Sequence, residues 1–365
     1  MKSQKTKTGI TLAIVMIYAM GIVDTYAQQE NKNTLNYGRL YGLALNQDIK
    51  TLLEEIDSVT VLSNEDENFK SKYENRFKYE YDKTDYFLKN DTALNSINRI
   101  YQDYWRKSLI DNSTNFDKPF EKKILGFLKS ENFKIKFTDL RINMKTLVDV
   151  YKSYIKSKGY HGGYGKVGSL FDFLVWKNES DTTYNVKLIC DTVLVNVTFM
   201  TGFISLGWEE YATFGKYYPG GWSTSTSLFC VKESYDLKSE KFLVNYLSHE
   251  GQHFSDLKRY PKLVQKDLEY RAKLTELYFA DNYIYSLIKL WINNSKYDIN
   301  NAHPFANYCI IRDMSKLLFG IDFQKDLGKW RQIPKEAINN AAKQLFIQNT
   351  DKLDSFGNEV VSLIN

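Results

Sequence analysis

The spacing of apolar residues in the first part of the chain predicts a series of helices. Between about residues 34 and 156, apolar side chains recur every three or four positions, and Pro and Gly are rare. The clearest stripes are Leu40, Leu43, Leu45, Ile49, Leu52, Leu53 and Ile56, and then Ile97, Ile100, Tyr101, Tyr104 and Trp105. Two further helices are expected at residues 119–128 and 146–155. No motif here indicates a binding site, so we expect a helical cover or spacer.

The pattern changes at a glycine-rich stretch, residues 158–165, where we place a domain boundary. Beyond it, apolar and polar residues alternate with a period of two, which predicts strands at residues 183–189, 192–200 and 222–231. His161 lies within the glycine-rich stretch, and we expect it to be an exposed loop histidine.

Long helices are expected to follow these strands. One runs from about Ser239, a suitable N-cap, to Tyr260, where Pro261 stops it. A second begins near Asp267 and extends to about Leu290, and the remainder of the chain also has helical spacing, including residues 309–318 and 334–348. Strands followed by paired helices indicate an α+β fold.

The first of these long helices carries the motif His-Glu-x-x-His, formed by His249, Glu250 and His253. Two of the chain's four histidines stand in it. On a helix, residues four apart lie one above the other, so both imidazoles can reach a single metal ion. The motif therefore predicts a metal site, provided that a third ligand follows.

The second long helix offers the third ligand, because a catalytic zinc ion normally takes three protein ligands and leaves a fourth position for water. We favour Glu269, with Glu276 as the alternative; the two are seven residues apart and share a helix face. Ala272 is small enough for the helices to approach, and Arg271 is expected to contact a ligand carboxylate from behind. Asp256 is a weaker alternative ligand, and we expect it instead to contact the ligands or to form a surface ion pair.

With these residues the chain resembles the zincin metallopeptidases, and among them the gluzincin type, over roughly residues 180–290. The residues that carry the resemblance are His249, Glu250, His253 and Glu269 or Glu276. It implies an antiparallel sheet packed on the motif helix, with an edge strand that pairs with extended peptide, for which residues 222–231 are the candidate. The metzincin extension is absent, because Asp256 and Arg259 stand where Gly and His are required.

The resemblance implies a zinc-dependent peptidase acting on a peptide or protein substrate. A zinc-activated water would attack the peptide carbonyl, with Glu250 as the general base that later protonates the departing amine. His303 is the candidate for an additional donor to the oxyanion. A loop histidine without a catalytic role is the plainer alternative for His303, and Tyr278 and Tyr283 are competing donors.

The start of the chain predicts export. Residues 1–27 combine lysines, an uncharged run and small residues before a cleavage point at Gln28, as in a secretory signal peptide; an uncleaved anchor is the alternative. We therefore expect a secreted or periplasmic protein with no membrane span after cleavage. Its expected parts are a helical N-terminal region, residues 28–157, and a zincin-like catalytic domain, residues 158–365.

Composition excludes some classes of function. The net charge of +5 comes from 49 basic and 44 acidic residues without long runs of one sign, which argues against nucleic-acid binding. Three cysteines are too few for a disulfide scaffold. We expect buried free thiols, with a bridge between Cys190 and Cys230 as the alternative. Composition does not indicate an oligomeric state.

Two other functions are compatible with the sequence. One is a binding or structural protein that has the zincin fold, with or without its metal, but no turnover. The other is a metal-dependent hydrolase of cell-wall glycopeptides, suggested by the export signal and by 27 tyrosines and 22 phenylalanines that could contact sugars.

Overall fold

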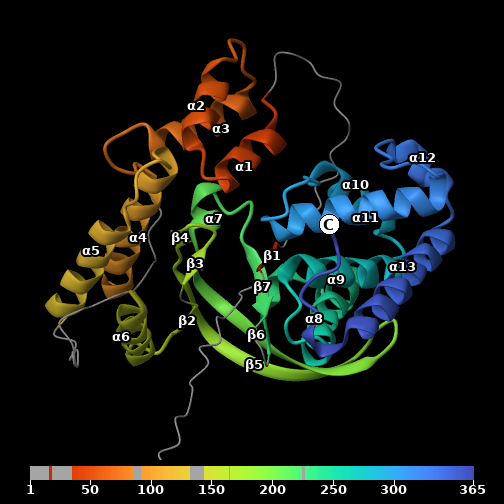
Figure 1. Cartoon of the computed structure of the whole chain (residues 1–365). Coiled ribbons are helices and arrows are strands. Elements are labelled where there is room, and N and C mark those ends of the chain that lie inside the picture. The colour runs from red at the N-terminus through yellow and green to blue at the C-terminus, as the bar shows by residue number, and fades with distance from the viewer. Residues whose placement is uncertain (1–15, 19–34, 85–91, 132–143, 164, 224–226) are drawn as a thin grey trace, which may run out of the picture. The chain divides into compact units, whose positions relative to one another are not determined.

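A computed structural model describes residues 16–18, 35–84, 92–131, 144–163, 165–223 and 227–365 (Figure 1). The expected signal peptide lies outside the described residues except for positions 16–18, so export stays a prediction. Among the described helices, none combines the length and the apolar character needed to cross a lipid bilayer.

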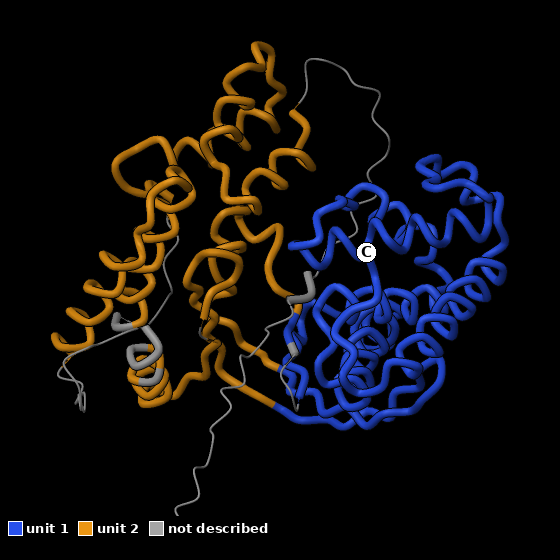
Figure 2. The backbone as a smooth tube through the Cα atoms, in the orientation of Figure 1, with its two compact units in different colours: residues 1–17, 180–199, 221–365 blue, residues 18–179, 200–220 orange. Residues whose placement is uncertain are grey.

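The chain forms two compact units (Figure 2). Unit 1 contains residues 1–17, 180–199 and 221–365, and unit 2 contains residues 18–179 and 200–220. Two long strands, β5 (Leu174–Lys187) and β6 (Thr192–Leu206), each contribute residues to both units. The domain boundary that the sequence indicates at residue 158 stays a prediction.

The helical N-terminal region is confirmed. Its helices are α1 (Tyr37–Leu45), α2 (Ile49–Asp57), α3 (Asn64–Phe77), α4 (Thr92–Ile110), α5 (Asp117–Ser130) and α6 (Met144–Ser157), and unit 2 also contains α7 (Trp208–Ala212). The first apolar stripe is divided between α1 and α2. Gln47 between them takes a positive φ of 62°, and the Asp48 side chain caps α2 by accepting the N–H of Thr51. Apolar periodicity alone does not show this break.

The sheet has the strand order β1-β7-β8-β6-β5-β2, and a separate pair is formed by β3 and β4. The remaining strands are β1 (Met16–Tyr18), β2 (His161–Gly163), β3 (Lys166–Val167), β4 (Leu170–Phe171), β7 (Pro219–Ser223) and β8 (Leu228–Val231). β7 and β8 pair antiparallel, with Trp222 opposite Phe229. The expected edge strand at residues 222–231 is therefore wrong as a single strand, and β8 is an inner strand of the sheet.

The sheet packs on the motif helix, as the resemblance to zincins implies. Strands β5 and β6 form a hairpin whose inward residues include Val195, Val197 and Phe199, all buried in one cluster with Phe242 and Tyr246. Contact with the motif helix is close at Gly251, where an added Cβ would lie 3.2 Å from Val186, 3.4 Å from Val193 and 3.5 Å from Leu188. A side chain at position 251 would therefore require Val186 to shift by a few tenths of an ångström.

The rest of unit 1 is helical, which confirms the α+β class. Its elements are the 3-10 helix η1 (Lys232–Ser234), the π-helix η2 (Lys241–Ser248), α8 (His249–Arg259), α9 (Gln265–Phe279), α10 (Ile284–Asn293), α11 (Ala302–Phe319), α12 (Leu327–Gln332), α13 (Lys335–Phe356) and the 3-10 helix η3 (Gly357–Glu359). The single helix expected from Asp267 to Leu290 is two helices, because Ala280 leaves the helical conformation with ψ 137°.

Helix α9 lies at the centre of these helices. Every residue from Asp267 to Leu277 is buried, including its charged residues. It contacts α8, α11 and α13 (Figure 1). A helix with charged residues on all sides usually lies at the surface. Because α9 is buried instead, its charged side chains need partners.

In unit 2, a carboxylate is buried between β4 and the start of α7. Asp172 Oδ1 accepts the backbone N–H groups of Phe173 at 3.0 Å and Trp208 at 2.8 Å. Gly207 has φ +94°, and a Cβ there would come within 2.3 Å of the same oxygen. Burial raises the pKa of Asp172 to about 7, although the two N–H groups lower it.

This carboxylate makes the stability of the protein depend on pH. Its pKa in the folded state lies above its ordinary value, so its contribution is favourable at low pH and is lost as the pH rises from about 4 to about 7. An Asp172→Asn variant keeps an oxygen for both N–H groups but cannot ionise. We expect its free energy of unfolding to rise relative to wild type by about 2–4 kcal/mol between pH 4.5 and pH 8. Urea unfolding followed by tryptophan fluorescence measures this, and a difference independent of pH would contradict the assignment.

Candidate metal centre

The His-Glu-x-x-His motif lies on the helix that the sequence predicts, but the first half of that helix is a π-helix. Ser239 Oγ accepts the N–H of Phe242 at the start, as expected of an N-cap. Within η2, Ser248 Oγ donates to the carbonyl of Leu243, five residues earlier. The α-helical hydrogen-bond pattern begins at His249, so the motif occupies the first turns of α8. Short π-helical turns are common beside functional sites.

Three buried side chains converge at this point. The Nε2 atoms of His249 and His253 are 3.1 Å apart, with the two rings nearly perpendicular. From α9, Glu269 places Oε1 at 3.4 Å from His253 Nε2 and Oε2 at 3.6 Å from His249 Nε2. The side chains come from two helices, and all three are buried.

These separations are compatible with one metal ion between the three side chains. With ligand bonds of about 2.0–2.1 Å, neighbouring ligand atoms lie about 3.3 Å apart. The nearest-atom separations of 3.1–3.6 Å involve both oxygens of Glu269, and with one ligand atom from each residue the three atoms lie within 4.8 Å of one another. Two imidazole nitrogens and a carboxylate are also a common donor set for divalent metal ions. His249, His253 and Glu269 could therefore hold one metal ion.

The surroundings of the cluster favour a cation. Burial alone lowers the pKa of His253, but the carboxylates of Glu269 and Glu250 raise it to about 9. Burial alone raises the pKa of Glu269, but the imidazoles of His303 and His253 hold it well below its usual range. The carboxylates thus create a negative potential in a buried place, which a metal ion would neutralise.

Glu276, the alternative third ligand, contacts the opposite side of a histidine. Its Oε1 lies 2.5 Å from His249 Nδ1, and its Oε2 accepts the side-chain N–H of Asn245 at 2.9 Å. Nδ1 is the ring nitrogen that does not face His253, so Glu276 fixes the orientation of His249. Asn245 was not among the residues that we expected at the site, although it lies four residues before His249, at the spacing that places residues on one helix face.

Glu250 and His303 both lie at the cluster. Glu250 is fully buried, with Oε1 at 3.9 Å from His249 Nε2. His303 Nδ1 is 2.9 Å from Glu269 Oε2, while the side chain of His303 is 43% exposed. His303 is not a loop residue, since it stands in the first turn of α11. The structure thus brings together the two histidines of the motif, a third histidine and three glutamates, Glu250, Glu269 and Glu276.

The other candidates lie elsewhere. Tyr278 and Tyr283 pack against the helical core. His161 is in strand β2 of unit 2, where it stacks on Trp176 and lies 3.1 Å from Glu179.

Arg271 does not contact the ligand carboxylate, contrary to our expectation. Its Nε donates to Asp256 Oδ2 at 2.9 Å, and its Nη1 donates to Asn349 and Thr350 of α13. Two positions along a helix turn a side chain by about 200°, so Arg271 faces away from Glu269. Asp256 is likewise no surface residue, because it forms a buried ion pair that joins α8 to α9.

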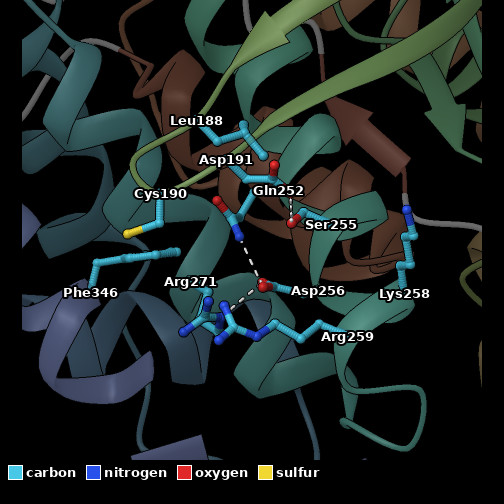
Figure 3. Close-up of a pocket in the computed structure, with 10 residues that line it drawn as sticks. All are labelled: Leu188, Cys190, Asp191, Gln252, Ser255, Asp256, Lys258, Arg259, Arg271 and Phe346. Carbon is cyan, nitrogen blue, oxygen red and sulfur yellow. Dashed lines mark hydrogen bonds and ion pairs between the residues drawn. The ribbon is translucent and has the colours of Figure 1, made fainter. Parts of the chain in front are cut away.

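A cavity of about 450 Å³ lies beside this ion pair (Figure 3). It is lined by Leu188, Cys190, Asp191, Gln252, Ser255, Asp256, Lys258, Arg259, Arg271 and Phe346, and none of His249, His253 and Glu269 is among them. Its polar side chains bond to one another: Gln252 donates to Asp256, and Ser255 donates to Asp191. The cavity is therefore distinct from the candidate metal centre.

The cysteines are free, as expected, but they are not all buried. Cys230 and Cys309 are buried, whereas Cys190 is exposed in the turn between β5 and β6. The apolar neighbours of Cys190 in the sequence are therefore misleading, because Leu188 lies in the same turn and is buried while Cys190 is exposed.

No protein-family model matches the chain, and comparisons with curated proteins and with solved structures gave no significant match. Support for a metal site at this cluster therefore comes from the geometry of this chain alone.

Removing a ligand tests the cluster directly. We expect wild-type protein to bind about one zinc ion per chain, and His253→Ala and Glu269→Ala to weaken binding by more than about 100-fold. Glu250→Gln is the matched control, because it alters a neighbouring buried carboxylate that is not a ligand, and it should retain zinc. Elemental mass spectrometry and competition with a chelating dye measure both quantities. Full zinc content in Glu269→Ala would contradict the ligand assignment.

Because Glu276 contacts His249 and is not itself a candidate ligand, we expect its substitution to lower zinc affinity less than loss of a ligand does. Glu276→Gln keeps the shape of the side chain but weakens the hydrogen bond to His249, so zinc affinity should fall by about 10–100-fold. The same chelator competition measures it. An affinity loss equal to that of Glu269→Ala would show that Glu276 is itself a ligand.

Proposed function

We propose that this chain is a zinc-dependent peptidase that acts after export, in the periplasm or outside the cell. The observation that carries the proposal is the convergence of His249, His253 and Glu269, with the carboxylate of Glu250 buried beside them. Three protein ligands leave one position of a tetrahedral ion for water, which is the arrangement of catalytic rather than structural zinc sites. When bound, zinc would supply a Lewis acid that lowers the pKa of water and polarises a carbonyl oxygen.

Glu250 is the proposed general base. It follows a ligand directly in the sequence, so the helix holds its carboxylate next to the ligand atoms without making it a ligand. An oxygen of Glu250 accepts a proton from the attacking water as the water's oxygen bonds to the peptide carbon. The same carboxyl group then gives the proton to the amine nitrogen as the C–N bond breaks, so the amine leaves in its neutral form.

His303 is the proposed donor to the oxyanion. Its Nδ1 is oriented by Glu269, and its side chain is partly exposed, so we propose that its other ring nitrogen reaches the substrate. Donation from that nitrogen would stabilise the negative charge that develops on the carbonyl oxygen.

Loss of the base should abolish turnover without loss of metal. We expect Glu250→Gln to lower kcat/KM for a peptide library by at least about 100-fold, at the level of general acid–base catalysis, with zinc content unchanged. Liquid chromatography with mass spectrometry of the cleaved peptides measures this, and a chelator should stop cleavage by the wild type. Unchanged cleavage in Glu250→Gln would contradict the role. Release of stem peptides from purified cell wall, with no cleavage of proteins, would favour the glycopeptide hydrolase instead.

Substitution of His303 tests the second role. His303→Phe should lower kcat more than it changes KM, by about 10–100-fold, since the donor acts on charge that develops in the transition state. Steady-state kinetics on the same peptides give both parameters. Wild-type kcat in this variant would dismiss the donor.

A further inference from the structure

The last six residues of the sequence lie along the first turn of α9 (Figure 1). Asp267, in that turn, is buried and accepts three hydrogen bonds from this segment. Its Oδ2 accepts the hydroxyl of Ser362 at 2.7 Å, and its Oδ1 accepts the N–H groups of Leu363 at 2.7 Å and Ile364 at 3.0 Å. One carboxylate thus holds three consecutive residues that are nearly a hundred positions away in the sequence.

Other contacts of the segment extend over both ends of this turn. The N–H of Val264, the N-cap of α9, donates to the carbonyl of Val361 at 2.9 Å. Lys266 Nζ donates to the carbonyl of Ile364 at 2.6 Å. Apolar contacts add to these bonds, because Val360 packs in a cluster with Leu263 and Leu268. The segment therefore contacts the start of α9 through backbone hydrogen bonds, through hydrogen bonds to the charged side chains of Asp267 and Lys266, and through apolar packing.

The start of α9 needs such support. Helices fray at their first turn, where four N–H groups have no partner within the helix. A Ser, Thr, Asp or Asn side chain usually caps this end, but the N-cap of α9 is Val264, and no side-chain cap is present. Glu269 is only two residues beyond Asp267. Fraying of this turn would move the Glu269 carboxylate away from the two histidines.

The same segment also reaches the helix that carries His303. Arg312 of α11 donates from Nη1 to the carbonyl oxygen of Asn365 at 2.8 Å. Ile364 packs in a cluster with Phe305 of α11 and Tyr270 of α9. The segment therefore ties α9 to α11, the two helices that place Glu269 and His303 beside each other.

We propose that residues 360–365 form a clamp that positions Glu269 for the metal ion, with Asp267 as the positioning residue that holds the clamp. The proposal rests on the proposed metal site and adds to it a dependence of metal affinity on a distant segment. Asp267 does not contact the ligand atoms, and it acts only through the conformation of the first turn of α9.

The first test uses Asp267→Ala, which leaves three donors of the clamp without their acceptor. In metal-free protein, hydrogen–deuterium exchange over residues 264–269 should become at least about tenfold faster. Zinc affinity, measured by chelator competition, should fall by about 10–100-fold. Glu359→Gln is the matched control, because it removes an exposed ion pair with Lys262 beside the clamp, and it should change neither quantity. If Asp267→Ala does not fold, Ser362→Ala removes one of the three bonds and should weaken zinc binding by about two- to fivefold.

The second test separates positioning from a general loss of stability. In a Glu269→Gln background, Asp267→Ala should weaken zinc binding no further, because the ligand that it positions is already altered. An equal loss in both backgrounds would overturn the positioning role, as would wild-type affinity in Asp267→Ala or in Ser362→Ala. Wild-type protein that binds no zinc would overturn the proposed function, and the clamp's role toward the metal with it.

Discussion

The arrangement of unit 1 depends on the cost of burying charge between α8 and α9. Isolated charges in a protein interior are costly, so each must be paired or must bind an ion. Here α8 carries His249, Glu250 and His253 at the interface, and α9 carries Glu269 and Glu276, which lie within ion-pair distance of His249. Most of these groups are partners for one another, and the negative charge that remains suits a divalent cation. The interface of the two helices is thus both a candidate metal site and a place where buried charges must be paired.

A second buried pair keeps the two helices in register. Arg271 and Asp256 join α8 to α9 on a different face from the candidate ligands, and Arg271 continues to α13 through Asn349 and Thr350. Such a pair contributes little net stability, but a slipped packing would leave both charges buried and alone. The geometry of the ligand cluster therefore depends on contacts that no ligand makes.

The sequence predicts the parts of the site that helical geometry alone determines. His249 and His253 share a face because they are four residues apart, and Glu269 is near them because the next helix packs on the first. The strands β5 and β6 follow from alternation, and the N-terminal helices from apolar spacing. Other features depend on which distant segments meet. No local pattern in the sequence predicts these features. Examples are the partners of Arg271, the inner position of β8 and the hydrogen bond from Leu363 to Asp267. The spacing of apolar residues does not reveal the helix break at Ala280, because apolar residues continue on both sides of it.

The central claim is that two imidazoles and one carboxylate hold a zinc ion. Zinc X-ray absorption spectroscopy of the reconstituted protein tests it most directly, because imidazole and carboxylate ligands give different scattering. The account predicts four nitrogen or oxygen neighbours at about 2.0–2.1 Å, with the outer-shell scattering of two imidazole rings. A spectrum with sulfur neighbours, or with oxygen neighbours and no imidazole scattering, would contradict it.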